Sequence, residues 1–269
     1  MTKVAIQGFT GSFHAIAAEK MLGSDIELVM CDSFPNLFKA LDLGQADYAV
    51  MAIENTIAGS ILFNYSLLHQ YQGLRIIAET SLKIEHFLMG LNGQELENIK
   101  EVRSHPMAIM QCMRFFRSYP EIRLVEDIDT AYMAQLISEK QTRGVAAIAG
   151  KNVAERFDLK ILKANIEDSD RNFTRFLVLK KTITNTESGT NKATVSFSIP
   201  NEKGQLKKLM DLFLTKNVNI ANIQSLPIVG KEWNYRFFCD LEYSMTVSEM
   251  ESFLFDNHIQ SHGHYIKGI

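Results

Sequence analysis

The sequence predicts an α/β domain followed by a smaller α+β domain. Short apolar strands alternate with helical patterns through residues 1–182, which is typical of parallel sheets covered by helices. A polar stretch at residues 183–192 then indicates a linker, because it contains Gly189 and only one large apolar side chain. Residues 193–269 follow the order strand, helix, strand, strand, helix, strand, which is the ferredoxin-like split pattern.

The elements of the first domain are predicted from apolar runs and helical spacing. Strands are expected at residues 4–6, 28–30, 48–53, 145–148 and 177–179, and helices at residues 12–22, 34–43, 61–70, 107–116 and 130–139. The second helix is well marked, since Leu37, Phe38 and Leu41 share one face. Ligands of such sheets bind beyond the carboxyl ends of the strands, so the turns that follow the strands are the candidate sites.

The second domain begins with a strand at residues 194–199, whose apolar side chains alternate with period two. A helix is expected at residues 204–215, where four apolar side chains form one stripe: Leu206, Leu209, Met210 and Phe213. The remaining elements are expected as strands at 220–226 and 233–242, a helix at 247–257 and a last strand near 264–266.

Composition limits the class of protein. The 269 residues are 46% hydrophobic and 22% charged, as in ordinary globular proteins. The net charge of −3 offers no basic field to nucleic acid, and no apolar run approaches the ~20 residues of a membrane span. The start of the chain enters a strand without a signal peptide, and Cys31, Cys112 and Cys239 lie far apart. We expect a cytoplasmic protein with reduced thiols and no nucleic-acid or membrane partner.

The first strand ends in a glycine turn that runs from Gly8 to His14. Ser12 in this turn is placed either to cap the following helix or to present its hydroxyl to a ligand. Free N–H groups at the start of a helix favour an anion. The residues alone leave both roles open.

A second polar turn follows the strand at residues 48–53. Glu54, Asn55 and Thr56 place a candidate proton donor beside an amide and a hydroxyl that could orient a ligand. The alternative is a turn in which Asn55 and Thr56 bond the local backbone while Glu54 is solvated.

A third turn, from Ser104 to Cys112, opens a helix. Pro106 suits the first helical turn and Ser104 is placed to cap it. His105 is expected to be a partly buried residue of the capping region rather than a catalytic base. Gln111 stands in an otherwise apolar stretch, and a buried amide needs hydrogen-bond partners.

Residues 172–176 place a hydroxyl beside a guanidinium at the mouth of a strand. Thr174 and Arg175 lie between Phe173 and Phe176 and lead into the apolar run at 177–179. Arginine stays charged and presents a fork that matches carboxylates, so this turn predicts a site for a small anion.

His262 and His264 stand two residues apart in the same domain as Cys239, and histidine and cysteine are common metal ligands. No four-ligand spacing accompanies them, so no metal is expected.

Taken in order, these motifs resemble the prephenate dehydratase family over nearly the whole chain. The glycine turn at 8–14 resembles the family's N-terminal turn, and Ile53-Glu54-Asn55-Thr56 its Ile-Glu-Asn-Ser turn. Ser104-His105-Pro106 resembles its Ser-His-Pro helix start, and residues 172–176 its Thr-Arg-Phe signature. The second domain is similar to an ACT regulatory domain, with Gly204-Gln205-Leu206 at the family's Gly-Ala-Leu loop.

The resemblance implies a catalytic domain of two α/β lobes, like a periplasmic binding protein, with a central cleft. It implies the decarboxylative dehydration of prephenate to phenylpyruvate in L-phenylalanine biosynthesis, without a metal or another cofactor. Thr174, Arg175 and Glu54 are then the catalytic candidates, and whether Thr174 or Glu54 donates the proton stays open. The residues expected to bind the substrate are Ser12, Asn55, Thr56, Ser104, Gln111 and Phe176.

The resemblance also implies an allosteric enzyme. L-phenylalanine would bind the ACT domain at an interface between two copies of the chain, in a homodimer or a homotetramer. The residues expected to contact this effector are Gly204, Gln205, Leu206, Asn222 and Ser225.

Several positions depart from the family pattern. Phe9 and Ala52 stand where a proline is usual, and Gln224 and Leu226 replace the acid and the arginine of a Glu-Ser-Arg-Pro motif. The loss of these two charges bears on the strength of phenylalanine inhibition. Two other functions fit the same residues: an arogenate dehydratase, which performs this chemistry on the transaminated substrate, and a non-catalytic module that binds a small anion.

Overall fold

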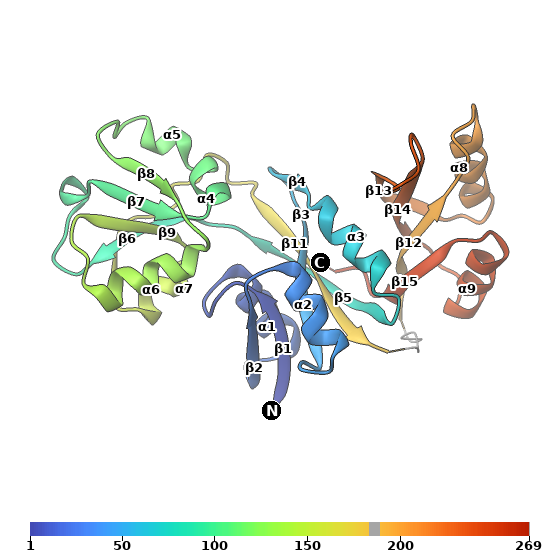
Figure 1. The fold of residues 1–269 in the computed structure, drawn as a ribbon, viewed down its shortest axis with the longest axis horizontal. Helices are drawn as coiled ribbons and strands as arrows, with labels where there is room; N and C mark the ends of the chain where they lie inside the picture. The colour runs from blue at the N-terminus through green and yellow to red at the C-terminus, as the bar shows by residue number, and fades with distance from the viewer. Residues whose placement is uncertain (183–188, 269) are drawn as a thin grey trace.

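The computed structural model describes residues 1–182 and 189–268, and the chain in it forms three sheets that follow one another in space (Figure 1). We call the unit around the first sheet the first lobe, the unit around the second sheet the second lobe, and the unit around the third sheet the C-terminal domain. Figure 1 shows the first lobe in the middle, with the second lobe and the C-terminal domain on either side of it.

The first lobe contains a mixed sheet in the order β2-β1-β3-β11-β5, with the short strand β4 paired to β3. Its strands are β1 (Thr2–Gln7), β2 (Ile26–Cys31), β3 (Tyr48–Asn55), β4 (Gly59–Ser60), β5 (Leu74–Lys83) and β11 (Phe173–Lys181). Its helices are α1 (Phe13–Leu22), α2 (Phe34–Asp42) and α3 (Leu62–Gln70).

The second lobe contains a sheet in the order β10-β6-β9-β7-β8. Its strands are β6 (Phe87–Leu91), β7 (Glu101–Ser104), β8 (Arg123–Glu126), β9 (Val145–Ala149) and β10 (Leu159–Lys163). The helical segments are η1 (Leu96–Asn98), α4 (Pro106–Met110), α5 (Met113–Phe116), α6 (Thr130–Lys140) and α7 (Lys151–Arg156).

The chain crosses between the lobes twice, after β5 and before β11, and the two crossing segments are joined by a hydrogen bond from Ile84 N to Asn172 O (2.7 Å). The return makes β11 antiparallel to both β3 and β5. The expectation of parallel sheets is therefore right for β1 with its neighbours and for β7 with its neighbours. It is wrong for the strands next to the crossings, β5, β6, β10 and β11.

The helix expected at residues 107–116 is divided into α4 and α5. Asp168 interrupts it, because its backbone N–H donates to the carbonyl of Gln111 (2.7 Å) and its Oδ1 accepts from the N–H of Arg114 (2.9 Å). These two bonds come from a segment that crosses the helix, and they take the place of a continuous helical ladder.

The C-terminal domain has an antiparallel sheet in the order β13-β14-β12-β15, with two helices between its strands in the chain. The elements are β12 (Lys192–Ser198), α8 (Gln205–Thr215), β13 (Asn219–Pro227), β14 (Tyr235–Glu242), α9 (Val247–Asp256) and β15 (Gln260–Tyr265). This is the expected ferredoxin-like arrangement. Strand β12 begins at Lys192, the last residue of the expected linker, and residues 183–188 of that linker lie outside the described part of the chain.

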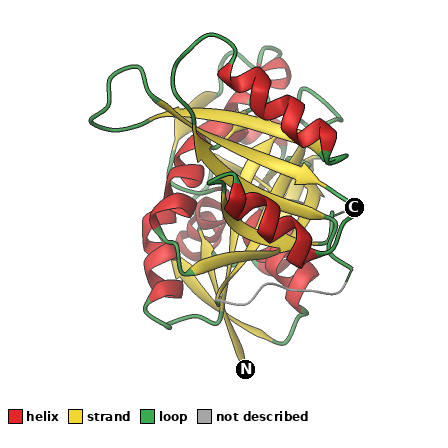
Figure 2. Ribbon diagram, turned by 90° about the vertical axis from the view of Figure 1, so that its right-hand side faces the viewer, coloured by secondary structure: helices red, strands yellow, loops and turns green. Residues whose placement is uncertain are grey.

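The sheet of the C-terminal domain is covered on both faces. Helices α8 and α9 pack on its outer face, and Figure 2 shows them in front of the strands. The other face contributes Leu226, Phe238 and Tyr265 to the same apolar cluster as residues of the first lobe, such as Leu37 and Tyr65. The C-terminal domain therefore shares a core with the first lobe.

Gly263 marks the closest approach of the two units. A Cβ atom there would lie 2.2 Å from the carbonyl oxygen and 2.7 Å from the nitrogen of Ile76 in β5, and the φ angle of +143° is one that L side chains rarely adopt. We expect Gly263→Ala to lower the free energy of unfolding in urea by about 2–4 kcal/mol, through overpacking and backbone strain.

The matched control for this change is Gly93→Ala. Gly93 also has a positive φ (+78°), but a Cβ atom there meets nothing within 4 Å. It should lose only about 1 kcal/mol, so equal losses for the two variants would contradict the close docking of β15 on β5.

Candidate active site

A cavity of about 350 Å³ lies where the two lobes meet, and we call it the cleft. Side chains of both lobes line it, and so do Ile84 and His86 of the crossing segment after β5. Its lining includes Ser12, Phe13, His14, Ala52, Asn55, Ser60, Ile61, Ile84, His86, His105, Met107, Gln111, Asp129, Thr174 and Phe176. Four residues expected at a binding site from the sequence, Ser12, Asn55, Gln111 and Phe176, thus lie together with Thr174 around one cavity.

Strand alternation decides which residues of the two signature turns reach the cleft. Thr174 pairs with Asn55 and Arg175 pairs with Glu54 across the antiparallel strands β11 and β3. Because successive side chains of a strand face opposite sides, one pair lines the cleft and the other faces away from it. Glu54 and Arg175 are therefore placed on the far side of the sheet from Thr174.

The hydroxyl of Thr174 is oriented by Asn55. The Asn55 side-chain amide donates to Thr174 Oγ1 (2.9 Å), and it also donates to Asn172 Oδ1 (2.7 Å). Asn55 is itself fixed, since its Oδ1 accepts from the backbone N–H groups of Ile57 (2.9 Å) and Ala58 (2.8 Å). With one lone pair engaged by an amide donor, the Thr174 hydroxyl can direct its own proton toward a ligand.

Gln111 is the buried amide whose partners the sequence left unknown. Its Oε1 accepts from Asn172 Nδ2 (2.9 Å) and lies 2.8 Å from His86 Nε2. An oxygen can only accept, so His86 carries its proton on Nε2 and is a donor here. The Gln111 N–H₂ group is then free of these partners, and it lies 3.5 Å from Asn55 Oδ1.

Two residues of this network, His86 and Asn172, were not among the site residues predicted from the sequence. Both are almost completely buried, and burial lowers the pKa of His86, which favours the neutral ring. They lie on the crossing segments, whose course between the lobes sequence periodicity does not reveal. Asn172 is the first residue of the stretch 172–176 that resembles the Thr-Arg-Phe signature, and this position was the available signal.

Three helices of nine residues or more begin at the cleft. Ser12, Ile61 and Asp129 are the N-cap residues of α1, α3 and α6, and all three line the cavity. Ser12 accepts from Ala15 N (3.3 Å), so it caps α1, which is one of the two roles that the sequence left open. Helix N-termini carry partial positive charge, so the cleft attracts an anion through its backbone.

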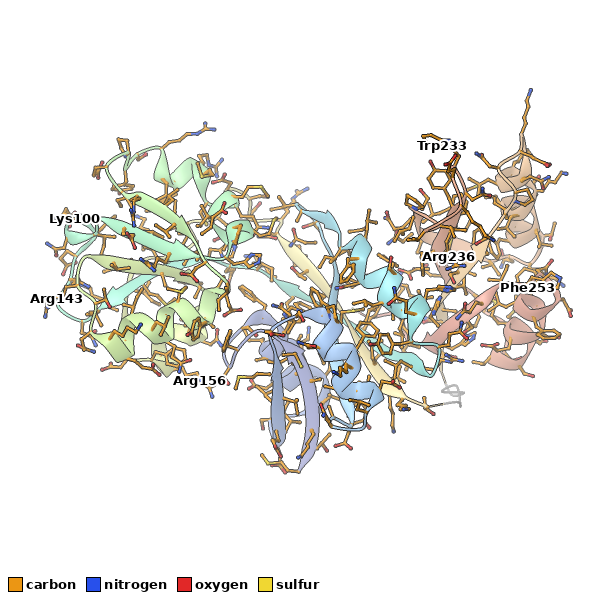
Figure 3. All side chains as sticks on the ribbon, in the orientation of Figure 1. Lys100, Arg143, Arg156, Trp233, Arg236 and Phe253 are labelled. Atoms are coloured by element: carbon orange, nitrogen blue, oxygen red, sulfur yellow. The ribbon has the colours of Figure 1, made fainter. Side chains whose placement is uncertain are left out.

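The charges near the cleft are unusual for an anion site. Among its lining residues within the described ranges, none is a lysine or an arginine. Figure 3 shows Lys100 and Arg143 at the outer end of the second lobe, away from the first lobe. Asp129 is a lining carboxyl group, and burial raises its pKa, so it is protonated more readily than an exposed aspartate.

His14 lies on the cleft wall with a fixed tautomer. Its Nε2 accepts from the backbone N–H of Ala52 (3.2 Å), and its ring meets Phe176 edge to face at 5.1 Å between centroids. Burial lowers the pKa of His14 to about 4, so the ring is neutral near pH 7. His14 thereby couples helix α1 to strand β3 at the position where the family usually has a proline.

Two other predicted site residues, Ser104 and Thr56, do not line the cleft but bond the backbone of segments next to it. Ser104 is fully buried and donates to Ile148 O (2.8 Å), and its expected place as the cap of α4 is taken by His105, whose Nδ1 accepts from Met107 N (3.2 Å). Thr56 bonds both Arg171 O (2.7 Å) and Phe173 N (2.9 Å), which ties the turn after β3 to the start of β11.

Glu54 and Arg175 form an ion pair, with 3.1 Å between Glu54 Oε1 and Arg175 Nε. Arg175 also lies 2.9 Å from Glu79 Oε2 and 2.6 Å from Asp240 Oδ2, which belongs to the C-terminal domain. The side chains of Glu54 and Arg175 thus contact other charged side chains of the protein, and neither of them lines the cleft.

The residues expected to bind an effector do not all share one surface. Asn222 on β13 donates to Glu54 Oε2 (2.9 Å) and to Tyr65 OH (3.2 Å), so it faces the first lobe. Ser225 is exposed. Gly204, with φ of +87°, caps α8, and Gln205 and Leu206 follow it half-buried in the first turn.

The histidines considered for a metal have other partners. His262 bonds Ser196 Oγ (2.8 Å), and His264 lies between Tyr243 OH (2.6 Å) and Glu251 (2.6 Å). Across residues 1–182 and 189–268, no three side chains of histidine, cysteine, aspartate or glutamate are grouped to hold a metal. No helix in the same ranges has the length and apolar content that crossing a membrane requires.

The fold and the cleft define a two-lobed α/β protein with a cavity between its lobes and a C-terminal α+β domain. The model of the prephenate dehydratase family matches residues 4–184, which include both lobes except for the first residues of β1. The chain therefore belongs to the prephenate dehydratase family.

The known proteins that resemble the chain include dehydratases and a protein described as an acylase. Arogenate dehydratase 2 of Petunia hybrida is 34% identical over 90% of the chain and 65% of its own length. The structure of a prephenate dehydratase from Arthrobacter aurescens, in complex with L-Phe, is 26% identical with a TM-score of 0.88 and covers 99% of this chain and 90% of that one. The structure of GqqA, described as a novel type of quorum quenching acylase, is 26% identical with a TM-score of 0.85 and covers 98% and 97%.

The chain spans about two thirds of the length of the curated relatives that it matches, which include the bifunctional chorismate mutase/prephenate dehydratase of Aquifex aeolicus.

The neutral ring of His14 makes a prediction about pH. In the unfolded chain the His14 ring takes up a proton near pH 6.5, whereas in the folded chain the same ring does so only near pH 4. The contribution of neutral His14 to the free energy of unfolding is therefore fully present above pH 6.5 and is lost as the pH falls toward 4. Between pH 7 and pH 5 it should lower the free energy of unfolding by at most about 2 kcal/mol.

Urea unfolding at the two pH values checks this expectation, with His14→Gln as the matched variant. Glutamine keeps an acceptor for the Ala52 N–H group but does not titrate. The variant should show a pH dependence that is smaller by that amount, and an unchanged dependence would assign the titration to other groups.

Proposed function

We propose that the chain catalyses the decarboxylative dehydration of prephenate to phenylpyruvate, the reaction that leads to L-phenylalanine. Membership of the family supports the reaction class. The single observation that carries the assignment of the site is the Thr174 hydroxyl, which lines the cleft and is oriented by Asn55 Nδ2 at 2.9 Å. The enzyme is then a carbon–oxygen lyase that acts in the cytoplasm.

Prephenate is a dianion, and one of its carboxylates must leave as carbon dioxide. A lysine or an arginine beside that carboxylate would stabilise the substrate more than the transition state, and so would not accelerate the reaction. The cleft instead offers the N-termini of α1, α3 and α6 and the neutral amide donor of Gln111. These groups attract the dianion through partial charges. Partial charges stabilise the carboxylate of the ground state less than a full positive charge would, so its loss as carbon dioxide is less hindered.

The chemical step requires a proton on the leaving hydroxyl group. The bond between the ring and the carboxylate breaks, its electrons complete the aromatic ring, and the carbon–oxygen bond to the hydroxyl breaks on the opposite side of the ring. We assign the proton donor to Thr174, whose hydroxyl hydrogen is left free for the leaving oxygen by the bond from Asn55. The leaving oxygen departs as water, and the Thr174 oxygen, which the Asn55 amide stabilises, takes up a proton from solvent to restore the hydroxyl. Phe176 and His14 form an apolar wall against which the ring can lie.

Glu54 is the rival donor, and its surroundings argue against that role. Its carboxylate is engaged by Arg175 and Asn222 on the other side of the sheet from the Thr174 hydroxyl. We therefore propose that Glu54 and Arg175 support the strand pair and do not touch the substrate.

Arogenate is the second candidate substrate, because a relative that is 34% identical is an arogenate dehydratase. Side-by-side turnover of prephenate and arogenate by the full chain separates the two. Binding of prephenate without turnover of either substrate would favour a non-catalytic binding module.

The C-terminal domain is proposed to be an ACT domain that binds L-phenylalanine and inhibits the enzyme, in a homodimer or a homotetramer. The complex of the Arthrobacter aurescens relative with L-Phe supports this proposal. Leu226, which stands where an arginine is usual, is buried against the first lobe and is not available to an effector. Inhibition is therefore expected to depend on residues on the other face of β13, which include Ser225.

Thr174→Val tests the assignment of the donor. Valine keeps the shape of threonine but cannot donate, so phenylpyruvate formation should fall by about 10²- to 10⁴-fold. Thr174→Ser, which keeps the hydroxyl, should retain most of the activity.

The comparison variant is Glu54→Gln. It should lose less activity than Thr174→Val and keep both limbs of the pH–rate profile, because glutamine can still accept from Asn222. A profile that loses one limb in Glu54→Gln, with normal turnover in Thr174→Val, would move the proton donor to Glu54.

A further inference from the structure

Five charged side chains meet between the first lobe and the C-terminal domain, and we call them the interdomain charge cluster. Glu54, Glu79 and Arg175 come from β3, β5 and β11, and Lys192 and Asp240 come from β12 and β14. Arg175 contacts all three carboxylates, at 3.1 Å from Glu54, 2.9 Å from Glu79 and 2.6 Å from Asp240. Lys192 adds a second contact to Glu79 at 2.9 Å.

Most of the cluster is removed from water. The side chains of Glu79 and Asp240 are 4% and 2% exposed, and that of Arg175 is 10% exposed. When one partner of a buried ion pair is removed, the charge left behind is uncompensated, and this is far more costly than the loss of a surface pair. Arg175 is therefore held most firmly when Asp240 is in place.

Asp240 is itself held by its own domain. Its Oδ1 accepts from Thr194 Oγ1 (2.7 Å), and Thr194 Oγ1 lies 2.7 Å from Tyr265 OH. All three residues are almost fully buried. The carboxylate thus reaches Arg175 from a fixed position on the sheet of the C-terminal domain.

The cluster shares its backbone with the cleft. Arg175 directly follows Thr174 on β11, and Glu54 directly precedes Asn55 on β3. The register shifts just after Arg175, so the pairing that places Thr174 against Asn55 spans only two residues before the irregularity. A contact that fixes Arg175 and Glu54 on one face therefore also fixes Thr174 and Asn55 on the other.

We propose that Asp240, a residue of the C-terminal domain, is a positioning residue for the reaction in the cleft. It acts through Arg175, which holds the end of β11 so that the Thr174 hydroxyl stays in line with Asn55. The inference rests on the proposed function for its activity readout. The inference means that the C-terminal domain helps to position Thr174 for the reaction even when no effector is bound.

The test is Asp240→Asn in the full chain, measured as phenylpyruvate formation from prephenate. Asparagine keeps the size of the side chain and an acceptor for Thr194, but it removes the charge that faces Arg175. We expect kcat to fall by about 10²-fold, the effect of a catalytic group displaced by roughly 1 Å. KM should stay within about threefold, because uniform binding in the cleft is unchanged.

The matched control is Tyr243→Phe. It removes another buried polar contact of the same domain, the 2.6 Å bond between Tyr243 OH and His264 Nδ1, without touching the charge cluster. Its kcat should equal that of the unmutated chain at temperatures where both variants are folded. An equal loss in the two variants, or a loss confined to KM in Asp240→Asn, would overturn the proposal.

A second readout does not depend on turnover. Hydrogen–deuterium exchange at residues 54–60 and 171–176 should accelerate in Asp240→Asn and not in Tyr243→Phe. If the unmutated chain does not turn over prephenate, the proposed function fails while this exchange measurement still decides the positioning role. If Asp240→Asn does not fold, Thr194→Val keeps the charge but frees the carboxylate, and it should show a smaller effect in the same direction.

Discussion

The antiparallel pairing of β3 with β11 is the constraint on which both functional surfaces depend. Side chains alternate across these strands, so one residue pair lines the cleft and the next pair faces the C-terminal domain. A slip of β11 by one residue would turn the Arg175 guanidinium into the cleft and bury the Thr174 hydroxyl among the charges, while Glu54 and Asn55 on β3 kept their faces. The return of the chain from the second lobe makes this pairing, and the bonds of Thr56 to residues 171 and 173 fix its register.

The same constraint explains how an anion site can exist next to a buried arginine. Arg175 is adjacent in sequence to Thr174, but its charge is neutralised by carboxylates on the other side of the sheet. The cleft keeps the weaker attraction of helix N-termini and amide donors. In the proposed reaction a carboxylate leaves as carbon dioxide, and this separation favours that step, since strong binding of the ground state would raise the barrier.

The sequence was sufficient for much of the fold and for most of the cleft. Helical spacing located α1, α2, α3 and α6 within a residue or two, and the turns that follow strands identified Ser12, Asn55, Gln111 and Thr174. The pattern missed β5 and four strands of the second lobe, β6, β7, β8 and β10. In β5 the reason is that Glu79 and Thr80 point inward, where an ion pair replaces the usual apolar contact. The pattern also could not assign faces to Glu54 and Arg175, since their direction depends on the pairing of β3 with a strand that returns much later in the chain, with a sequence separation of 119 residues between Asn55 and Thr174.

The interface between the first lobe and the C-terminal domain combines two kinds of contact with different roles. The apolar cluster that joins Leu226, Phe238 and Tyr265 to the first lobe is non-directional and supplies the free energy of docking. Buried ion pairs add little net stability, because desolvation offsets their attraction, but they tolerate few alternative arrangements. A leucine at position 226, where the family pattern has an arginine, strengthens the first kind of contact at the edge of the interface. The charges of Arg175 and Asp240 then determine the register in which the two sheets meet, and through β11 they determine the position of the threonine in the cleft.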